Sequence, residues 1–230
     1  CYNDKKNYLS YGLNLLKKIS NSEFDNYGFT RSRNIKQLIF YLKYYILIRE
    51  WFKEAQSEVP ENVNETIYYL GQGYAFFWKN INSDILMNGN NISNNIEFDQ
   101  YLKRFSYKFK NESKEFGGYT ILKDKKISIV MDIGTPPSPR FSPKYQSGAL
   151  SLEIISNGKK LISNCGYYDG KNEKLINLSK STAAQSTLVI DDNSSCKFKK
   201  FNGNYLVNDS LKILKKNIVF EKNYWKINAS

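Results

Sequence analysis

The chain has 230 residues, of which 41% are hydrophobic and 24% are charged, and it contains no histidine. This composition is typical of a folded globular protein and excludes a disordered chain. The most apolar stretch, residues 38–48, is interrupted by Lys43 and is shorter than the ~20 residues that a membrane span needs. Because the chain begins at Cys1 rather than Met, we expect it to be an internal piece of a longer protein.

The formal net charge of +12 has two readings. It is the charge expected of a protein with a polyanionic partner, such as an acidic polysaccharide, a nucleic acid or an anionic membrane surface. It also follows from AT-biased codon usage, which enriches Lys together with Asn and Ile. No block of Lys and Arg and no RNA-binding signature favours a nucleic acid, so none is expected as a partner.

The first half of the chain is helical by its hydrophobic period. Apolar residues recur near every 3.6 positions, which predicts amphipathic helices. Asn34 is a suitable N-cap for the second helix, and Pro60 suits the first turn of the third. The third helix carries Tyr74, Phe77 and Trp78, which could stack on sugars or form core. The predicted helices are residues 8–19, 34–55, 61–79 and 96–109.

From Gly117 onward the period changes to two, which predicts strands that follow one another without intervening helices. The predicted strands are residues 119–122, 127–132, 150–154, 160–163, 187–190 and 211–219. Helices first and strands afterwards favour an α+β, multidomain chain. We predict a helical domain over residues 1–112 and an antiparallel β domain over residues 113–230, and we expect the β domain to be truncated. Four prolines between residues 136 and 143 predict an extended loop inside the β domain.

The three cysteines do not define a metal site or a disulfide framework, because they show no CxxC spacing. Cys165 and Cys196 could pair if their strands are neighbours, but buried free thiols on strands are the favoured interpretation. We therefore expect no metal, and nothing in the sequence indicates a cofactor.

Three runs of sequence resemble the heparinase II/III family of polysaccharide lyases. They are Gly148-Ala-Leu-Ser-Leu-Glu153, Leu161-Ile-Ser-Asn-Cys-Gly166 and Ser181-Thr-Ala-Ala-Gln-Ser-Thr-Leu-Val-Ile-Asp-Asp192. The family patterns that they resemble are H-A-x-x-L-S-F-E, a strand that closes on Gly, and R-S/G-T-x-A-H-N/S-T-V-x-V-D-G. Upstream, Gly28-Phe-Thr-Arg-Ser-Arg-Asn34 and Leu86-Met-Asn-Gly89 are similar to family segments that end in S-R-N and read L-F-N-G.

The resemblance implies the end of an (α/α) toroid followed by an antiparallel β-sandwich. It also implies β-elimination on a uronate-containing acidic polysaccharide. The family neutralises the substrate carboxylate, removes the C5 proton with Tyr or His, and protonates the leaving oxygen, usually with Tyr. A periplasmic or cell-envelope location is favoured by the same resemblance.

The family histidines are all replaced in this chain. They fall on Gln146, on Gln185, on Thr30 and near Lys79. Glutamine cannot act as a base near neutral pH, but its amide can hydrogen-bond a carboxylate or a sugar hydroxyl. The zinc site of some relatives lacks its histidine ligands here, and no Cys/Asp cluster compensates for them.

The resemblance suggests a set of site residues, each with a structural alternative. Tyr145, Gln146 and Gln185 are the predicted catalytic group, with Tyr145 transferring protons if Lys144 or Arg140 lowers the pKa of its phenol. The alternative for any one tyrosine is ordinary packing. The predicted substrate-binding residues are Arg33, Asn34, Lys79, Asn88 and Arg140.

For three of the substrate-binding residues the structural alternative is specific. Arg33 could instead form a surface ion pair, Asn34 could be only a helix cap, and Asn88 with Gly89 could be only a turn.

Three functions remain open from the sequence. The leading hypothesis is a polysaccharide lyase. The alternative is a catalytically impaired glycan-binding or cell-envelope structural protein on the same scaffold, and replacement of Tyr145 by Phe separates the two because only a lyase would lose turnover. A remote third hypothesis is a basic nucleic-acid-binding module, for which binding would depend steeply on salt.

Overall fold

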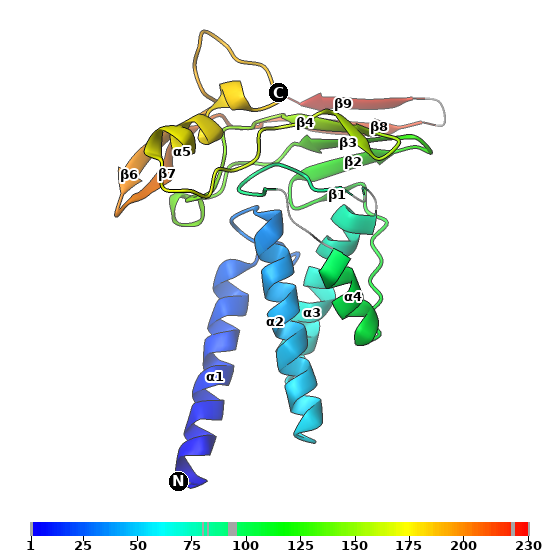
Figure 1. Cartoon of the computed structure of the whole chain (residues 1–230), viewed down its shortest axis with the longest axis vertical. Coiled ribbons are helices and arrows are strands. Elements are labelled where there is room, and N and C mark those ends of the chain that lie inside the picture. The colour runs from blue at the N-terminus through cyan, green and yellow to red at the C-terminus, as the bar shows by residue number, and fades with distance from the viewer. Residues whose placement is uncertain (1, 80, 82, 92–95, 222–223, 230) are drawn as a thin grey trace.

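The chain folds as a layer of helices below a layer of antiparallel strands (Figure 1). The structure is a computed structural model that describes residues 2–79, 81, 83–91, 96–221 and 224–229. The helical layer contains α1 (Tyr2–Glu23), α2 (Ile35–Glu54), α3 (Glu61–Tyr74) and α4 (Ile96–Arg104). The predicted mixture of helices and antiparallel sheet is therefore confirmed.

The helices begin where the sequence places their caps. The Asn34 side-chain oxygen accepts hydrogen bonds from the backbone N–H groups of Lys36 and Gln37, at 2.9 and 3.2 Å. These bonds satisfy two of the donors that the first turn of α2 leaves free. Pro60 precedes α3, which continues directly into a π-helix, η1 (Ala75–Lys79). The predicted helix over residues 61–79 is thus present, but its last turn is wider than an α-turn.

Five strands form the main sheet in the order of the chain. They are β1 (Glu115–Phe116), β2 (Tyr119–Lys123), β3 (Ile127–Asp132), β4 (Leu152–Ser156) and β5 (Lys159–Ile162), and all neighbours are antiparallel. The turn between β4 and β5 is Asn157-Gly158, and both residues have positive φ. This is the backbone that a tight hairpin turn requires.

Two hairpins and a helix complete the second half of the chain. The hairpins pair β6 (Cys196–Phe201) with β7 (Asn204–Ser210), and β8 (Lys216–Phe220) with β9 (Trp225–Ala229). Helix α5 (Glu173–Lys180) is capped by the side chain of Asn172. Short 3-10 turns lie at η2 (Pro139–Phe141) and η3 (Thr182–Ala184).

The sequence prediction was wrong in two strand regions. Residues 187–190 form no strand; Leu188 and Ile190 are exposed, and a single bridge from Ile190 to Asn193 closes a turn. An alternating apolar pattern is not enough to form a strand when no neighbour supplies the ladder. The predicted strand over residues 211–219 is only partly present. The structure has β8 from Lys216, and residues 211–215 form no strand.

Cys165 and Cys196 are free thiols, as the favoured interpretation predicted. Cys196 is buried on β6, in agreement with that interpretation. Cys165 was predicted to be a buried thiol on a strand. In the structure it is exposed and lies in an irregular segment after β5.

One hydrophobic core joins the two layers. The ring of Phe29, from the segment between α1 and α2, packs against Phe77 of η1, Phe116 of β1 and Tyr119 of β2, at 5.8, 5.6 and 6.1 Å between ring centroids. Tyr74 and Phe77, two of the aromatic residues that could have stacked on sugars, are buried in this core, and Trp78 packs against it. None of the described helices is long and apolar enough to cross a membrane.

The close packing of α3 predicts opposite effects for two helical glycines. A Cβ added at Gly71 would lie 2.1 Å from the ring of Phe109, whereas a Cβ at Gly12 in α1 would meet nothing within 4 Å. Gly71→Ala should therefore lower the free energy of unfolding by about 1–3 kcal/mol through overpacking. Gly12→Ala should raise it by about 0.5–1 kcal/mol through helix propensity. Urea unfolding measures both, and a Gly71→Ala protein as stable as the parent would contradict the packing described here.

Candidate functional site

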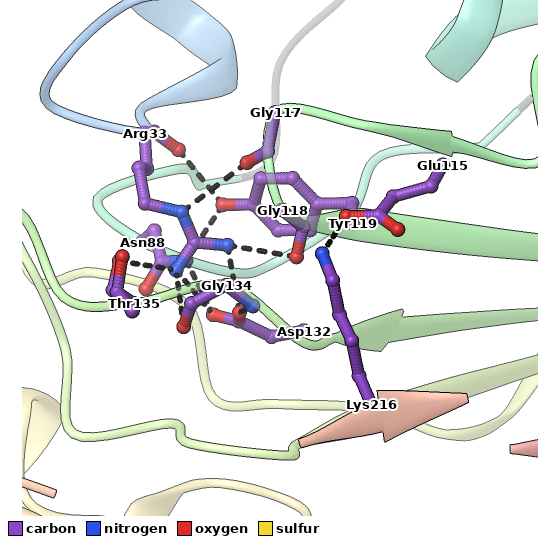
Figure 2. A network of polar contacts seen from close by, with 10 residues as sticks. All are labelled: Arg33, Asn88, Glu115, Gly117, Gly118, Tyr119, Asp132, Gly134, Thr135 and Lys216. Atoms are coloured by element: carbon purple, nitrogen blue, oxygen red, sulfur yellow. Dashed lines mark hydrogen bonds and ion pairs between the residues drawn. The ribbon is translucent and has the colours of Figure 1, made fainter. Parts of the chain in front are cut away.

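A buried ion pair connects the helical layer to the sheet (Figure 2). Arg33 lies just before α2, and its Nη2 is 2.7 Å from Oδ1 of Asp132, the last residue of β3. The remaining guanidinium donors reach backbone carbonyls of two loops. Nε donates to Gly117, Nη2 to Gly118 and Nη1 to Gly134, at 3.2, 3.0 and 3.3 Å.

The environment of Arg33 keeps its charge fixed. Burial is the largest single influence and lowers the pKa of the guanidinium, but Asp132, Tyr119 and Tyr145 together outweigh it and raise that pKa above its ordinary value. Arg33 was predicted to bind a substrate carboxylate, and ion pairing was its structural alternative. In this structure its guanidinium faces Asp132, and only 7% of the residue is exposed.

Asn88 and Tyr119 extend this network to a second loop. Nδ2 of Asn88 donates to Oδ2 of Asp132 and to the hydroxyl of Tyr119, at 2.7 and 2.6 Å. The Tyr119 hydroxyl in turn donates to the carbonyl of Arg33, at 2.8 Å. Arg33 and Asn88 both have left-handed backbone, with φ of 59° and 50°. Such a conformation costs a non-glycine residue about 1 kcal/mol, so the network holds both loops in a shape that they would not adopt alone.

The two glutamines predicted to be catalytic meet at one carbonyl. Nε2 of Gln146 and Nε2 of Gln185 both donate to the backbone oxygen of Ser179 in α5, at 2.7 and 2.9 Å. The other end of the Gln146 amide accepts from the backbone N–H of Gly89, at 3.1 Å, and Nε2 also donates to the carbonyl of Gly166. Both residues are buried. The structure therefore brings Gln146 and Gln185 together, and each amide hydrogen-bonds the protein itself.

Tyr145 lies beside this pair but points into the protein. Its side chain is 1% exposed and packs in a small apolar cluster with Cys196 and Val207. Its hydroxyl has no hydrogen-bond partner among the described residues. Burial, reinforced by Asp132, raises the pKa of Tyr145 well above its ordinary value. Proton transfer by Tyr145 was predicted to need a lowered pKa of its phenol, whereas in the structure this pKa is raised.

The remaining predicted binding residues are scattered. Asn34 is buried and caps α2. Arg140 extends into solvent from η2, and its Nη2 is 3.6 Å from a carboxylate oxygen of Glu23. Lys79 ends η1, and its side chain lies outside the described part of the structure. Asn34 lies next to Gly89, whose N–H donates to Gln146, whereas Arg140 faces Glu23. The binding roles of Asn34, Arg140 and Lys79 stay predictions.

A group of polar residues beside Gln146, called the polar mouth here, was not predicted as a unit from the sequence. It consists of Asn34, Gly89, Lys144, Tyr167 and Asp169. A Cβ added at Gly89 would lie 2.5 Å from Nδ2 of Asn34 and 2.8 Å from Cβ of Lys144, so these residues surround the glycine closely. Lys144 Nζ is 2.6 Å from Oδ1 of Asp169 and 5.5 Å from the ring centroid of Tyr167.

The Tyr167 phenol in this mouth is half-buried and remains a proton donor. Burial, followed by Asp169, raises its pKa above the ordinary value. The signal that could have found it is its position directly after Gly166, the glycine that ends the second family-like run.

A buried lysine lies near the ring of Tyr167. Lys180, the last residue of α5, donates from Nζ to the carbonyls of Pro143 and Tyr205, at 2.6 and 3.0 Å. Its ammonium nitrogen lies 5.9 Å from the Tyr167 ring centroid. Burial lowers the pKa of Lys180 to about 7, although the carbonyls around Nζ favour the charged form. Lys180 thus fixes the Pro-rich segment against α5 and β7.

A cleft of about 970 Å³ lies at the junction, lined by Arg33 but by none of the residues of the polar mouth. Its walls come from the segment between α1 and α2, from residues 134–138 with Phe141, and from residues 213–216 between β7 and β8. Gly117, Gly118 and Arg33 also line it, and Figure 2 shows these residues with Lys216 and Glu115 close by. Within the described residues, no group of three or more His, Cys, Asp or Glu side chains could hold a metal ion.

The fold is similar to solved heparinase structures. The heparan sulfate lyase HepC from Pedobacter heparinus matches with a TM-score of 0.68 and 15% identity, over 86% of this chain and 37% of that one. A structure described as heparinase III matches with a TM-score of 0.65 and 15% identity, over 92% and 38%. The BT4657 gene product, a heparinase III with methylated lysines, matches with a TM-score of 0.64 and 17% identity, over 80% and 32%.

The chain spans a little over a third of the length of these relatives at most. No curated protein sequence matches it. The sequence model described as "Heparinase II/III-like, C-terminal" matches residues 112–230, which is more than half of the chain. This chain therefore belongs to the heparinase II/III-like family, and residues 112–230 carry the family's C-terminal domain.

Proposed function

We propose that the chain is part of a polysaccharide lyase that cleaves a uronate-containing acidic polysaccharide by β-elimination. The observation that carries the proposal is the match of residues 112–230 to the heparinase II/III-like C-terminal domain. The net charge of +12 supports an acidic substrate, because a basic surface attracts a polyanion. In this proposal residues 1–112 are the end of an (α/α) toroid, and residues 113–230 are part of an antiparallel β-sandwich.

We place the chemistry at the polar mouth of Asn34, Gly89, Lys144, Tyr167 and Asp169. β-Elimination removes the C5 proton, which the carboxylate of Asp169 accepts in this proposal. It forms the C4–C5 double bond and releases the C4 oxygen, which takes a proton from a general acid. A cation beside the uronate carboxylate makes the C5 proton more acidic, and the ammonium group of Lys144 can serve there. The amide nitrogen of Asn34, next to Gly89, can donate a hydrogen bond to the same carboxylate.

Tyr167 is the proposed donor of the proton to the leaving oxygen. A phenol with a raised pKa holds its proton at neutral pH, which suits a general acid. The predicted catalytic residues Tyr145, Gln146 and Gln185 lie behind this mouth. In this proposal the two glutamines hold the backbone around it, and Tyr145 transfers a proton only if its hydroxyl becomes accessible.

A specific observation favours the second candidate, a glycan-binding protein that has lost catalysis. Gln146 and Gln185 cannot titrate, and the pKa of the buried Tyr145 is raised by burial and by Asp132. A lyase site needs a base, and none of these three groups is suited to act as one near neutral pH. On this reading the chain binds an acidic glycan without cleaving it.

The lyase proposal predicts an unsaturated product. Incubation of the chain, and of the longest reading frame that contains it, with a panel of uronate polymers should raise ultraviolet absorbance, because the new C4–C5 double bond is conjugated to the carboxylate. Boiled protein is the control. If no polymer in the panel gives a signal with either protein while direct binding persists, the glycan-binding alternative replaces the lyase.

Two tyrosine variants locate the proton transfer. Tyr167→Phe should lower turnover by at least about 100-fold, the usual contribution of a general acid. Tyr145→Phe is the matched control, because it removes a buried hydroxyl without a partner and should change the free energy of unfolding by less than about 0.5 kcal/mol. Initial rates and thermal unfolding measure both. If Tyr145→Phe abolished turnover while Tyr167→Phe remained active, the sequence-based role of Tyr145 would stand and that of Tyr167 would fall.

A further inference from the structure

The cleft of about 970 Å³ is lined by cationic side chains, two of which have no ion-pair partner among the described residues. Arg31 and Lys215 both line it, both are exposed, and neither forms an ion pair with another described residue. The other two cations of the lining are already matched, since Lys216 pairs with Glu115 and Arg33 pairs with Asp132. The cleft therefore has free positive charge on two walls, on the segment between α1 and α2 and on the segment between β7 and β8.

Exposed aromatic rings stand beside these cations. Tyr27 and Tyr69 line the cleft and are 74% and 44% exposed. The backbone next to Tyr27 lies against Tyr69, because a Cβ added at Gly28 would lie 2.2 Å from the Tyr69 Cβ. Oδ1 of Asp25 fixes the same turn by accepting from the backbone N–H groups of Tyr27 and Phe29. An exposed ring with a polar hydroxyl is a suitable surface for the apolar face of a sugar.

The remaining lining groups distinguish between kinds of polyanion. Asp25 and Glu115 place two carboxylates in the cleft, and the carbonyls of Gly117 and Gly134 lie at its floor. Carboxylates and carbonyls accept hydrogen bonds from sugar hydroxyls. The cleft offers two unpaired cations, whereas a nucleic acid requires neutralisation of closely spaced phosphates along its backbone.

We propose that this cleft is a binding site for a stretch of acidic polysaccharide. Arg31 and Lys215 contact its carboxylate or sulfate groups, and Tyr27 stacks on a sugar ring. The inference goes beyond the proposed reaction, since the cleft contains neither Lys144 nor Tyr167. It rests on the proposed function only in taking the anionic ligand to be a polysaccharide.

Calorimetric titration of the chain tests the ligand class. The probes are a sulfated uronate oligosaccharide, an alginate oligosaccharide with carboxylates only, a neutral cello-oligosaccharide and a single-stranded DNA oligonucleotide. We expect at least one acidic oligosaccharide to bind, with an affinity that falls as salt is added, and the neutral one to bind much more weakly. The first two probes tell whether sulfate is needed. Equal affinity for the neutral sugar, or tighter binding of DNA than of either acidic sugar, would overturn the proposal.

A charge-matched pair of variants tests the location. Arg31→Gln combined with Lys215→Gln should weaken binding by about ten-fold or more, because each residue supplies a charge-assisted hydrogen bond. Lys197→Gln combined with Lys199→Gln removes the same charge from exposed positions of β6 that do not line the cleft, and it should weaken binding less than about three-fold. Tyr27→Ala should also weaken binding while leaving thermal unfolding unchanged. Equal losses in the two charge variants would refute a site in the cleft.

Binding and turnover are recorded on the same samples, so the two proposals fail separately. Binding that depends on Arg31 and Lys215 without any unsaturated product would support the cleft and refute the lyase. Turnover together with binding that is insensitive to the cleft variants would refute the cleft alone.

Discussion

The ion pair between Arg33 and Asp132 is the constraint on which the junction of helices and sheet depends. Taking two charges out of water is costly, and the cost is offset only when the remaining donors and acceptors are satisfied. Here they are satisfied. The guanidinium reaches the carbonyls of Gly117, Gly118 and Gly134, and the Asp132 carboxylate also accepts from Nδ2 of Asn88 and from the backbone N–H of Gly134. Removal of either partner would leave an unpaired buried charge at a point where four chain segments meet.

The two proposed surfaces, the cleft and the polar mouth, both adjoin this ion pair. Because Arg33 turns inward with left-handed backbone, Arg31 remains outside on the wall of the cleft and Asn34 is placed to cap α2 beside Gly89. The ion pair also positions Asn88, and the next residue, Gly89, donates its N–H to Gln146. The cleft and the polar mouth thus lie at one junction, and Arg33 of the charge pair also lines the cleft.

Local sequence patterns predicted the elements but not the way in which they meet. The cap at Asn34 and the main strands were predictable, because period and capping chemistry act over a few residues. Helix α5 and the β6–β7 hairpin were missed, although Asn172 is a cap and the Asn202-Gly203 turn is a hairpin signal, because short polar segments carry little hydrophobic period. The burial of Tyr145 could not be predicted, since it depends on Cys196 and Val207, which lie more than 50 positions later in the chain.

The two buried glutamines are the main reason for placing proton transfer at the polar mouth and not at Gln146 and Gln185 themselves. Gln146 and Gln185 stand where the resemblance places family histidines, and their amide nitrogens share the carbonyl of Ser179. A carboxamide carries a donor and an acceptor whatever the pH, so it can hold these backbone groups without titrating. A histidine has one donor and one acceptor only while it is neutral, and its proton moves with pH. The replacement therefore makes the inner part of the junction a fixed support. This is why the proposed proton donor is Tyr167, which is only half-buried and lies beside Lys144.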